Sequence, residues 1–308
     1  MPRFRVPPGA DLSLTTFLRD AVGTSLRRAR EWIRSGRVTV EGRVVTDPAA
    51  RPPAGARVEL HDRAPLPPSR PVLAGPGFRV LLLDAALVVV DKDPGIVTVP
   101  TTDPDPGDLP LVARVLAALA EAGRGAGGEL HVVHRIDRET SGLVLFARTA
   151  RDAARLRGQF RARRPLREYL GWTAGRPDRD EGTLRHLLAE PRPGREVLVV
   201  EEGGSTGREA VLKYRVEASR REPAPRARVR FRLVTGRRNQ VRVQAAATGW
   251  PLLGDRWYGI GGDPGPGRLA LHAARLGFVH PRSGRRVLCE APLPPDLASL
   301  DRSLFGED

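Results

Sequence analysis

Residues 131–146 read HVVHRIDRETSGLVLF, a polar cluster enclosed by two apolar runs. The cluster, residues 134–142, contains one histidine, two arginines and two carboxylates. Charged side chains are rarely fully buried unless they are paired, whereas the apolar runs on both sides are typical of core strands. The cluster therefore belongs either on a surface turn or in a site with chemistry of its own.

The net charge of the whole chain points to a polyanionic partner. Among 308 residues, Lys and Arg together number 51 and Asp and Glu 36, which gives a formal net charge of +15. Proteins this basic usually bind a polyanion. Nucleic acid is therefore the leading partner expected from composition.

Cysteine usage and hydropathy exclude other classes. Cys289 is the single cysteine, which excludes an internal disulfide and a cysteine-rich zinc site. The N-terminus, MPRFRVPPGA, lacks the apolar stretch of a signal peptide. The most apolar segment, 80–91, is too short to span a bilayer and is interrupted by Asp84. We expect a soluble cytoplasmic protein with no membrane partner.

The N-terminal region predicts a compact basic module. Apolar spacing predicts helices over 12–20 and 24–34, and the alternation over 37–45 predicts a hairpin. A charged helix is most often only a solvated face, but here helix and hairpin are basic together, which favours RNA binding. The candidate contacts are Arg27, Arg28, Arg30, Arg34 and Arg37.

A proline-rich stretch predicts the domain boundary. Residues 61–78 contain five prolines and little periodicity, which is typical of an extended linker. We expect an RNA-binding domain over 1–62, a linker over 63–78 and a catalytic domain over 79–308.

The catalytic region mixes strands with a few helices, which indicates an α+β fold with a largely antiparallel mixed sheet flanked by helices and loops. Helices are expected at 109–122, 150–162 and 239–248. Strands are expected at 79–83, 86–91, 96–99, 143–147, 169–173, 210–217, 227–234, 269–271 and 286–289.

Several chemistries could explain the polar cluster. His134, Asp137 and Ser141 are the letters of a hydrolase triad, but the chain has no G-x-S-x-G elbow. His131 and His134 are too sparse for a metal site, so none is expected. Asp137 and Glu139 could be a glycosidase pair, but two positions apart on an extended turn they would point in opposite directions.

A distant arginine offers a further explanation. In NQVRVQ (239–244) Arg242 stands among small apolar neighbours, and an unpaired buried charge is very costly. We therefore expect Arg242 to pair with a buried acid, and Asp137 is the natural candidate. A purely structural ion pair would explain the same pattern.

These segments of the chain resemble those of a known family, the RluA-type pseudouridine synthases. The cluster resembles their His-Arg-Leu-Asp-x-x-Thr-Ser-Gly motif, and four further segments follow in the family's order. One of them, 235–259, resembles Gly-Arg-x-His-Gln-Ile-Arg-x-His followed by Gly-x-Pro-x-x-Gly-Asp-x-x-Tyr-Gly. Residues 12–60 resemble the RNA-binding domain first seen in ribosomal small-subunit protein four. The other resembling segments are 87–100, 167–172 and 269–294.

The resemblance implies isomerisation of uridine to pseudouridine in RNA without a cofactor. It implies that Asp137 is the nucleophile, that Tyr169 stacks on the uracil and serves as a general base, and that Arg242 pairs with Asp137. Whether the aspartate attacks the sugar or the base stays open. The substrate contacts it implies are Arg135, Arg138, Thr140, Leu271 and His134.

The chain departs from the family pattern in places. Asn239 and Gln244 replace the histidines of the arginine motif, and Arg167 replaces the lysine before Tyr169. We expect an active monomeric enzyme acting on RNA, with large-subunit ribosomal RNA favoured and transfer RNA as the alternative. The competing hypotheses are an RNA-binding protein that has lost turnover and a hydrolase.

Overall fold

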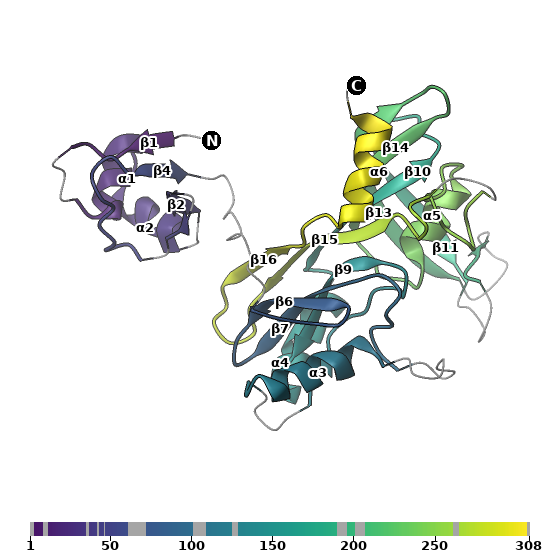
Figure 1. Ribbon diagram of the computed structural model, residues 1–308, viewed down its shortest axis with the longest axis horizontal. Helices are drawn as coiled ribbons and strands as arrows, with labels where there is room; N and C mark the ends of the chain where they lie inside the picture. The colour runs from purple at the N-terminus through teal and green to yellow at the C-terminus, as the bar shows by residue number, and fades with distance from the viewer. Residues whose placement is uncertain are drawn as a thin grey trace. The chain divides into compact units, whose positions relative to one another are not determined.

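The computed structural model describes residues 3–8, 12–34, 37–41, 43–45, 47–60, 72–100, 109–124, 129–189, 196–200, 207–260 and 265–306. The chain divides into two compact units, Met1–Arg70 and Pro71–Asp308. Each unit has a hydrophobic core of its own. Figure 1 shows the helices and strands of both units.

In the smaller unit two helices pack on a sheet with the strand order β1-β4-β2-β3. The Oγ atoms of Ser13 and Ser25 cap the two helices, each accepting a backbone N–H at 3.2 Å. The predicted order of two helices and a hairpin is confirmed. The elements are β1 (Arg3–Arg5), α1 (Leu14–Val22), α2 (Leu26–Arg34), β2 (Val38–Val40), β3 (Arg43–Val44) and β4 (Arg57–Leu60).

The larger unit is built on a 12-stranded sheet, and the predicted α+β class with a largely antiparallel sheet is confirmed. Its main path runs β12-β11-β13-β14-β10-β15-β9-β7-β6-β5, with β16 on β15 and β8 on β9. The strands are β5 (Leu73–Gly75), β6 (Phe78–Leu83), β7 (Leu87–Lys92), β8 (His131–Val132), β9 (Ser141–Ala147), β10 (Leu166–Ala174), β11 (Glu181–Leu188), β12 (Val199–Val200), β13 (Arg208–Arg220), β14 (Arg226–Leu233), β15 (Leu271–Val279) and β16 (Arg286–Glu290).

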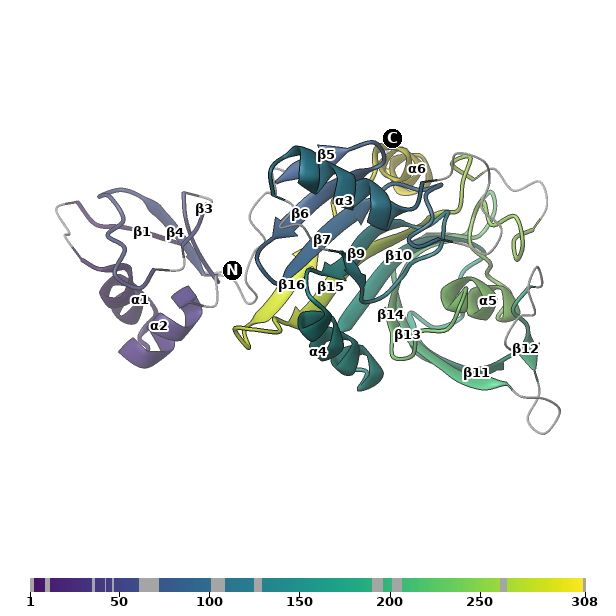
Figure 2. The same ribbon diagram turned by 90° about the horizontal axis from the view of Figure 1, so that it is seen from below.

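Helices cover both faces of this sheet. Along β7, Val88 and Val90 pack with α3 (Leu111–Glu121), while Leu87 and Val89 pack with α4 (Ala150–Arg161). Figure 2 shows these two helices on opposite sides of the strands. In the other half, α5 (Gln240–Ala247) and α6 (Pro295–Phe305) cover opposite faces. Burial on both faces explains the nearly continuous apolar runs of β7 and β9.

The two halves of the sheet meet where β9 and β15 pair in parallel. Gly142 lies opposite Ala273 there and has φ +110°. A Cβ on Gly142 would stand 2.4 Å from the Ala273 carbonyl oxygen, so the close approach requires glycine. This junction fixes the polar cluster, which directly precedes β9, at the centre of the sheet.

Some predicted elements are corrected. Residues 96–99 form a loop rather than a strand, and β15 extends far beyond the predicted 269–271. Strand β11 and helix α6 were not predicted. Within the expected linker 63–78, residues 73–75 and 78 belong to strands of the larger unit, and 63–71 lie outside the described residues.

Candidate active site

The backbone around Asp137 is held from both sides. Thr98 Oγ1 donates to the carbonyl oxygen of Ile136 at 2.9 Å and accepts its N–H at 3.4 Å. After Asp137, its own carbonyl oxygen accepts the Thr140 N–H at 3.2 Å. The loop containing Asp137 is therefore fixed independently of any substrate.

Lys92 is a further residue that holds the loop containing Asp137. Its Nζ donates to the carbonyl oxygens of Arg138 and Asp93 at 2.8 and 2.9 Å, and the side chain is fully buried. Burial lowers the pKa of Lys92 to about 7, although Asp137 and Glu139 oppose the shift by attraction. Lys92 was not predicted as a site residue.

Arg242 pairs with an acid that the sequence analysis did not choose. Its Nε and Nη2 donate to the two carboxylate oxygens of Asp255, both at 2.7 Å. The side chains of Arg242 and Asp255 are 8% and 0% exposed. Within the described residues Asp137 has no ion pair within 4.0 Å, so the prediction that Arg242 forms this pair with Asp137 is wrong.

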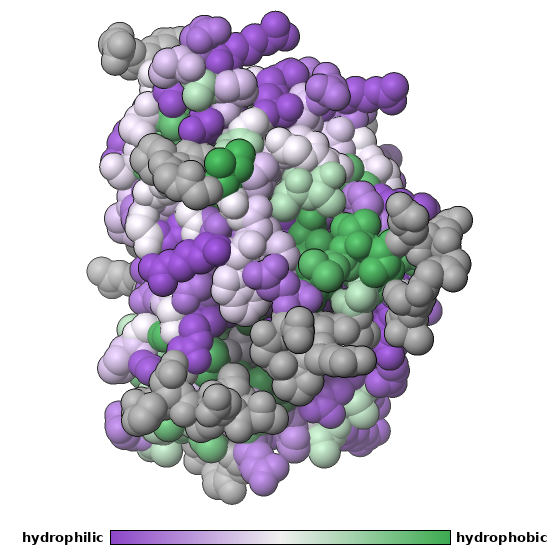
Figure 3. Space-filling view, turned by 90° about the vertical axis from the view of Figure 1, so that its right-hand side faces the viewer, coloured by the Kyte–Doolittle hydropathy of each residue, from purple (hydrophilic) through white to green (hydrophobic). Residues whose placement is uncertain are grey.

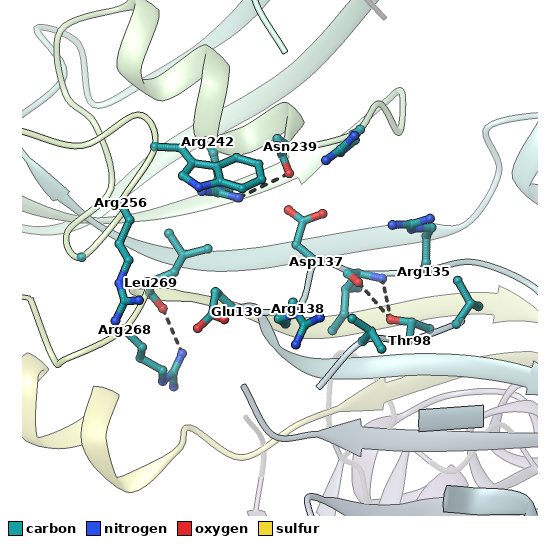
Figure 4. Close-up of a pocket in the computed structure, with 16 residues that line it drawn as sticks. Thr98, Arg135, Asp137, Arg138, Glu139, Asn239, Arg242, Arg256, Arg268 and Leu269 are labelled. Atoms are coloured by element: carbon teal, nitrogen blue, oxygen red, sulfur yellow. Dashed lines mark hydrogen bonds between the residues drawn. The ribbon is translucent and has the colours of Figure 1, made fainter. Parts of the chain in front are cut away.

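Arg242 still acts on Asp137 through its charge. Burial raises the pKa of Asp137, and attraction from Arg242, Arg135, Arg238 and Lys92 opposes this shift. Figure 4 shows the Asp137 carboxylate turned toward Asn239 and Arg242. The carboxylate is thus surrounded by cations without being bound by any of them.

Two cavities meet at Asp137. One, of about 600 Å³, includes Tyr169 in its wall and is called the tyrosine cavity. The other, of about 320 Å³, includes Trp257 and is called the tryptophan cavity. The two share the lining residues Arg135, Ile136, Asp137, Arg238, Asn239 and Arg242.

The tyrosine cavity combines an aromatic ring, apolar side chains and arginines. Tyr169 and Leu271 line it together with Thr140. Burial, with the nearby Asp137, raises the pKa of Tyr169 to about 12, so its phenol is neutral at pH 7. An aromatic face beside a carboxylate can hold a planar base at reacting distance.

The remaining predicted substrate contacts differ in their surroundings. Arg135 is exposed and lines both cavities, whereas Arg138 lines only the tryptophan cavity. His134 lines the tyrosine cavity, but its Nε2 accepts the Leu145 N–H at 3.1 Å and its ring stacks on Phe160 at 4.9 Å. Burial lowers the pKa of His134 to about 3, so a neutral imidazole supports the fold there.

The two replaced family histidines have different positions. Asn239 lines both cavities and accepts from Arg242 Nη1 at 3.4 Å. Gln244 is fully buried outside the cavity walls, where its Nε2 donates to the Ala210 carbonyl oxygen at 3.1 Å. Only the first replacement can therefore touch a substrate in either cavity.

The smaller unit presents arginines on one helix. Arg27, Arg28 and Arg30 are exposed on α2 and are called the α2 arginines. Arg37 is half-buried, with its guanidinium 5.6 Å from the centroid of Trp32. Arg34 is in α2, but its side chain lies outside the described part of the structure.

The described residues offer neither a metal site nor a membrane-spanning helix. No group of three or more His, Cys, Asp or Glu residues among them could hold a metal ion. None of the helices in the described ranges is long and apolar enough to cross a membrane.

Comparison with known proteins agrees with this geometry. A family model described as RNA pseudouridylate synthase matches residues 86–247, and an S4 domain model matches residues 17–58. The uncharacterized RNA pseudouridine synthase YlyB of Bacillus subtilis is 32% identical over 91% of this chain and 89% of its own length. Ribosomal large subunit pseudouridine synthase D of Vibrio parahaemolyticus is 30% identical over 91% of this chain and 86% of its own length.

A solved structure shows the same fold. Human RNA pseudouridylate synthase domain containing 4 superposes with a TM-score of 0.59 at 23% identity, covering 72% of this chain and 91% of its own. The matched family region contains β9, β10 and α5, which carry or adjoin Asp137, Tyr169 and Arg242. This chain belongs to the RNA pseudouridylate synthase family, as an RNA pseudouridine synthase with an N-terminal S4 domain that binds RNA.

Proposed function

We propose that the enzyme converts specific uridines of large-subunit ribosomal RNA to pseudouridine, with Asp137 as the nucleophile. The observation that carries the proposal is the position of Asp137, a carboxylate where two cavities meet, among cations and without an ion pair within 4.0 Å in the described structure. A carboxylate whose lone pairs are not engaged in an ion pair is available to attack.

The reaction exchanges one bond of the uracil for another. The bond between uracil N1 and ribose C1′ breaks, and a bond between uracil C5 and C1′ forms. The hydrogen on C5 leaves as a proton and N1 gains one, so the product is an isomer of the substrate. The enzyme therefore needs a nucleophile, a surface that holds the detached base, and exclusion of water.

The tyrosine cavity supplies the surface for the base. We assign the uracil to a position against Tyr169 and Leu271, beside Asp137. Because the phenol of Tyr169 is neutral at pH 7, it serves in this proposal as a stacking surface, and its service as a general base is not part of it. A uridine must leave its stack to enter such a cavity.

Arginines would hold the RNA backbone around the cavity. Arg135 is exposed at the rim, and Arg138 lies one residue beyond Asp137. Guanidinium groups bind phosphates in a bidentate way. Ribosomal RNA is favoured because a relative that aligns with 91% of this chain is named ribosomal large subunit pseudouridine synthase D. Transfer RNA remains the alternative substrate.

The test is tritium release from RNA labelled at uracil C5. Unmodified large-subunit ribosomal RNA and transfer RNA are incubated with wild type, Asp137→Asn and, as a matched control, Asp178→Asn, which changes an exposed carboxylate in the β10–β11 turn. Release by wild type and Asp178→Asn alone is expected, with RNA affinity of Asp137→Asn within a few-fold of wild type. Tritium release at the full rate by Asp137→Asn would refute the assignment of Asp137 as the nucleophile. Release from transfer RNA alone would refute ribosomal RNA as the substrate.

A further inference from the structure

The tryptophan cavity contains an aromatic surface that the proposed chemistry does not use. Trp257 is 50% exposed in the turn that follows α5, and it lines this cavity together with Asp137. The surface shown in Figure 3 is largely hydrophilic, with apolar side chains gathered in a few places. The half-exposed indole thus offers an aromatic face inside a cavity that also contains Asp137.

We propose that Trp257 is a stacking platform for the base of a nucleotide next to the target uridine. The inference rests on the proposed function in placing the target uracil in the tyrosine cavity. Because the two cavities share Asp137 and Arg135, a nucleotide in the tryptophan cavity neighbours the one beside Asp137. The site thus binds at least two nucleotides of one strand.

The indole is held ready for stacking. The backbone N–H of Trp257 donates to Asp255 Oδ1 at 3.0 Å. The guanidinium of Arg242 lies 5.2 Å from the ring centroid, and the ring of Tyr258 meets it edge-on at 6.4 Å. Since Asp255 is itself fixed by two hydrogen bonds from Arg242, little side-chain freedom is left to lose on binding.

The charge of the cavity fits a nucleic-acid strand. Arg238 is exposed at its wall. Arg256, also exposed, and Arg268 line it as well (Figure 4). An aromatic platform surrounded by arginines is typical of sites that bind unstacked nucleotides, with the base on the ring and the phosphates on the guanidiniums. Arg268 is already paired with Asp296, but a neutral apolar ligand would leave Arg238 and Arg256 without a counter-charge from the ligand.

Trp257 lies at a position that the family pattern leaves unspecified. Arg256 and Trp257 occupy the two unspecified positions of the Gly-Asp-x-x-Tyr-Gly pattern in 254–259. The fixed members of the pattern have structural partners here, since Asp255 binds Arg242 and the Tyr258 hydroxyl accepts from Asn239 Nδ2 and from the Val197 N–H. The two variable positions face the cavity and can set which flanking nucleotide is preferred.

The test compares Trp257→Ala, Trp257→Phe and Trp257→Leu in the full-length enzyme. The control is Ile260→Ala, which truncates a 61% exposed apolar side chain in the same turn. KM and kcat are measured by tritium release from whichever labelled RNA the wild type modifies. Base stacking on an aromatic side chain contributes enough for a roughly 5- to 150-fold rise in KM on its loss. We expect that rise in KM for Trp257→Ala and Trp257→Leu, with kcat nearly unchanged. The KM of Trp257→Phe and of Ile260→Ala should stay within about threefold of wild type.

A second measurement does not depend on turnover. In the Asp137→Asn background, oligouridylate is titrated while tryptophan fluorescence is followed, and stacking is expected to quench a signal that Trp257→Phe abolishes. Equal KM for wild type and Trp257→Ala, full rescue by Leu, a fall in kcat alone, or quenching that persists in Trp257→Phe would each overturn the platform. Tritium release by Asp137→Asn, or none by wild type, would instead refute the proposed function.

Discussion

Replacing Arg242 by Ala should destabilise the larger unit strongly. The guanidinium makes two hydrogen bonds of 2.7 Å to Asp255, and the side chains of Arg242 and Asp255 are 8% and 0% exposed. The substitution leaves a fully buried carboxylate without its cation. Removing one partner of a buried ion pair typically costs about 3–5 kcal/mol, and we expect a loss of that size in the free energy of unfolding.

Calorimetry of the full-length chain measures this loss. For a unit of this size, 1 kcal/mol shifts the melting temperature by about 2–4 °C, so the transition of the larger unit should fall by about 6–20 °C. Arg256→Ala is the matched control, because Arg256 is exposed in the turn that contains Asp255. Its unfolding free energy should stay within about 0.5 kcal/mol of wild type.

Two results would refute the reasoning. A wild-type melting temperature for Arg242→Ala would show that the pair contributes nothing to stability. The double variant Arg242→Met with Asp255→Asn should recover most of the loss, because it removes both buried charges and keeps an Oδ1 that can accept the Trp257 and Tyr258 N–H groups. A loss in the double variant equal to the sum of the single losses would show that the two side chains do not interact.

Three further predictions concern the junction of the sheet, the nucleophile and the smaller unit. Gly142→Ala should destabilise the larger unit by about 3 kcal/mol or more, because φ is +110° and the new Cβ would meet the Ala273 carbonyl oxygen at 2.4 Å; an unchanged melting temperature would contradict this. In the proposed mechanism only ionised Asp137 attacks, and its pKa is raised, so kcat should fall with acid at a higher pH than an ordinary aspartate would give. Arg238→Gln, which removes a cation that stabilises the carboxylate, should move this acid limb to still higher pH, and a shift to lower pH would contradict the electrostatics. Changing the three α2 arginines to Gln should reduce the salt-dependence slope of RNA binding by about 2–3 if each contacts one phosphate, and an identical slope would remove them from the interface.

The sequence predicted best where burial imposes a simple pattern. Strands β7 and β9 are buried on both faces, so their apolar runs are continuous and could be recognised. Residues 96–99 have the same β-branched character but form a loop, in which Thr98 holds the backbone of Ile136 next to Asp137. Local composition cannot distinguish a strand from a loop fixed by long-range hydrogen bonds.

Helix α6 and Lys92 were not predicted, although the sequence contains an indication of each. Helix α6 packs through Leu297, Leu300 and Leu304, whose spacing is helical, and its first residue is Pro295. Strand β11 alternates between exposed and half-buried residues, and Leu188 is its one buried residue, so its weak alternation gave little indication. Lys92 could have been noticed as one of only two lysines in the chain, placed directly after a buried apolar run.

The ion-pair partner of Arg242 could be predicted from the sequence only in part. The argument that an arginine among small apolar residues needs a buried acid was correct, but two acids were within reach in the fold. Asp255 forms the pair because the turn after α5 returns it beside the first turn of that helix, where its Oδ1 also accepts the Trp257 and Tyr258 N–H groups. A one-dimensional pattern contains no information on which acid the fold returns to the helix.

This choice of partner has a consequence for the proposed chemistry. Two charge-assisted hydrogen bonds from Arg242 to Asp137 would occupy the carboxylate lone pairs that must attack and would lower the pKa of that carboxyl. With Asp255 as the partner, the guanidinium stays fixed and charged near Asp137 without binding it. Asp137 therefore has nearby cations that favour its ionised form and oxygens that remain open to a substrate, so the Asp255 pair serves the nucleophile by keeping Arg242 from binding it.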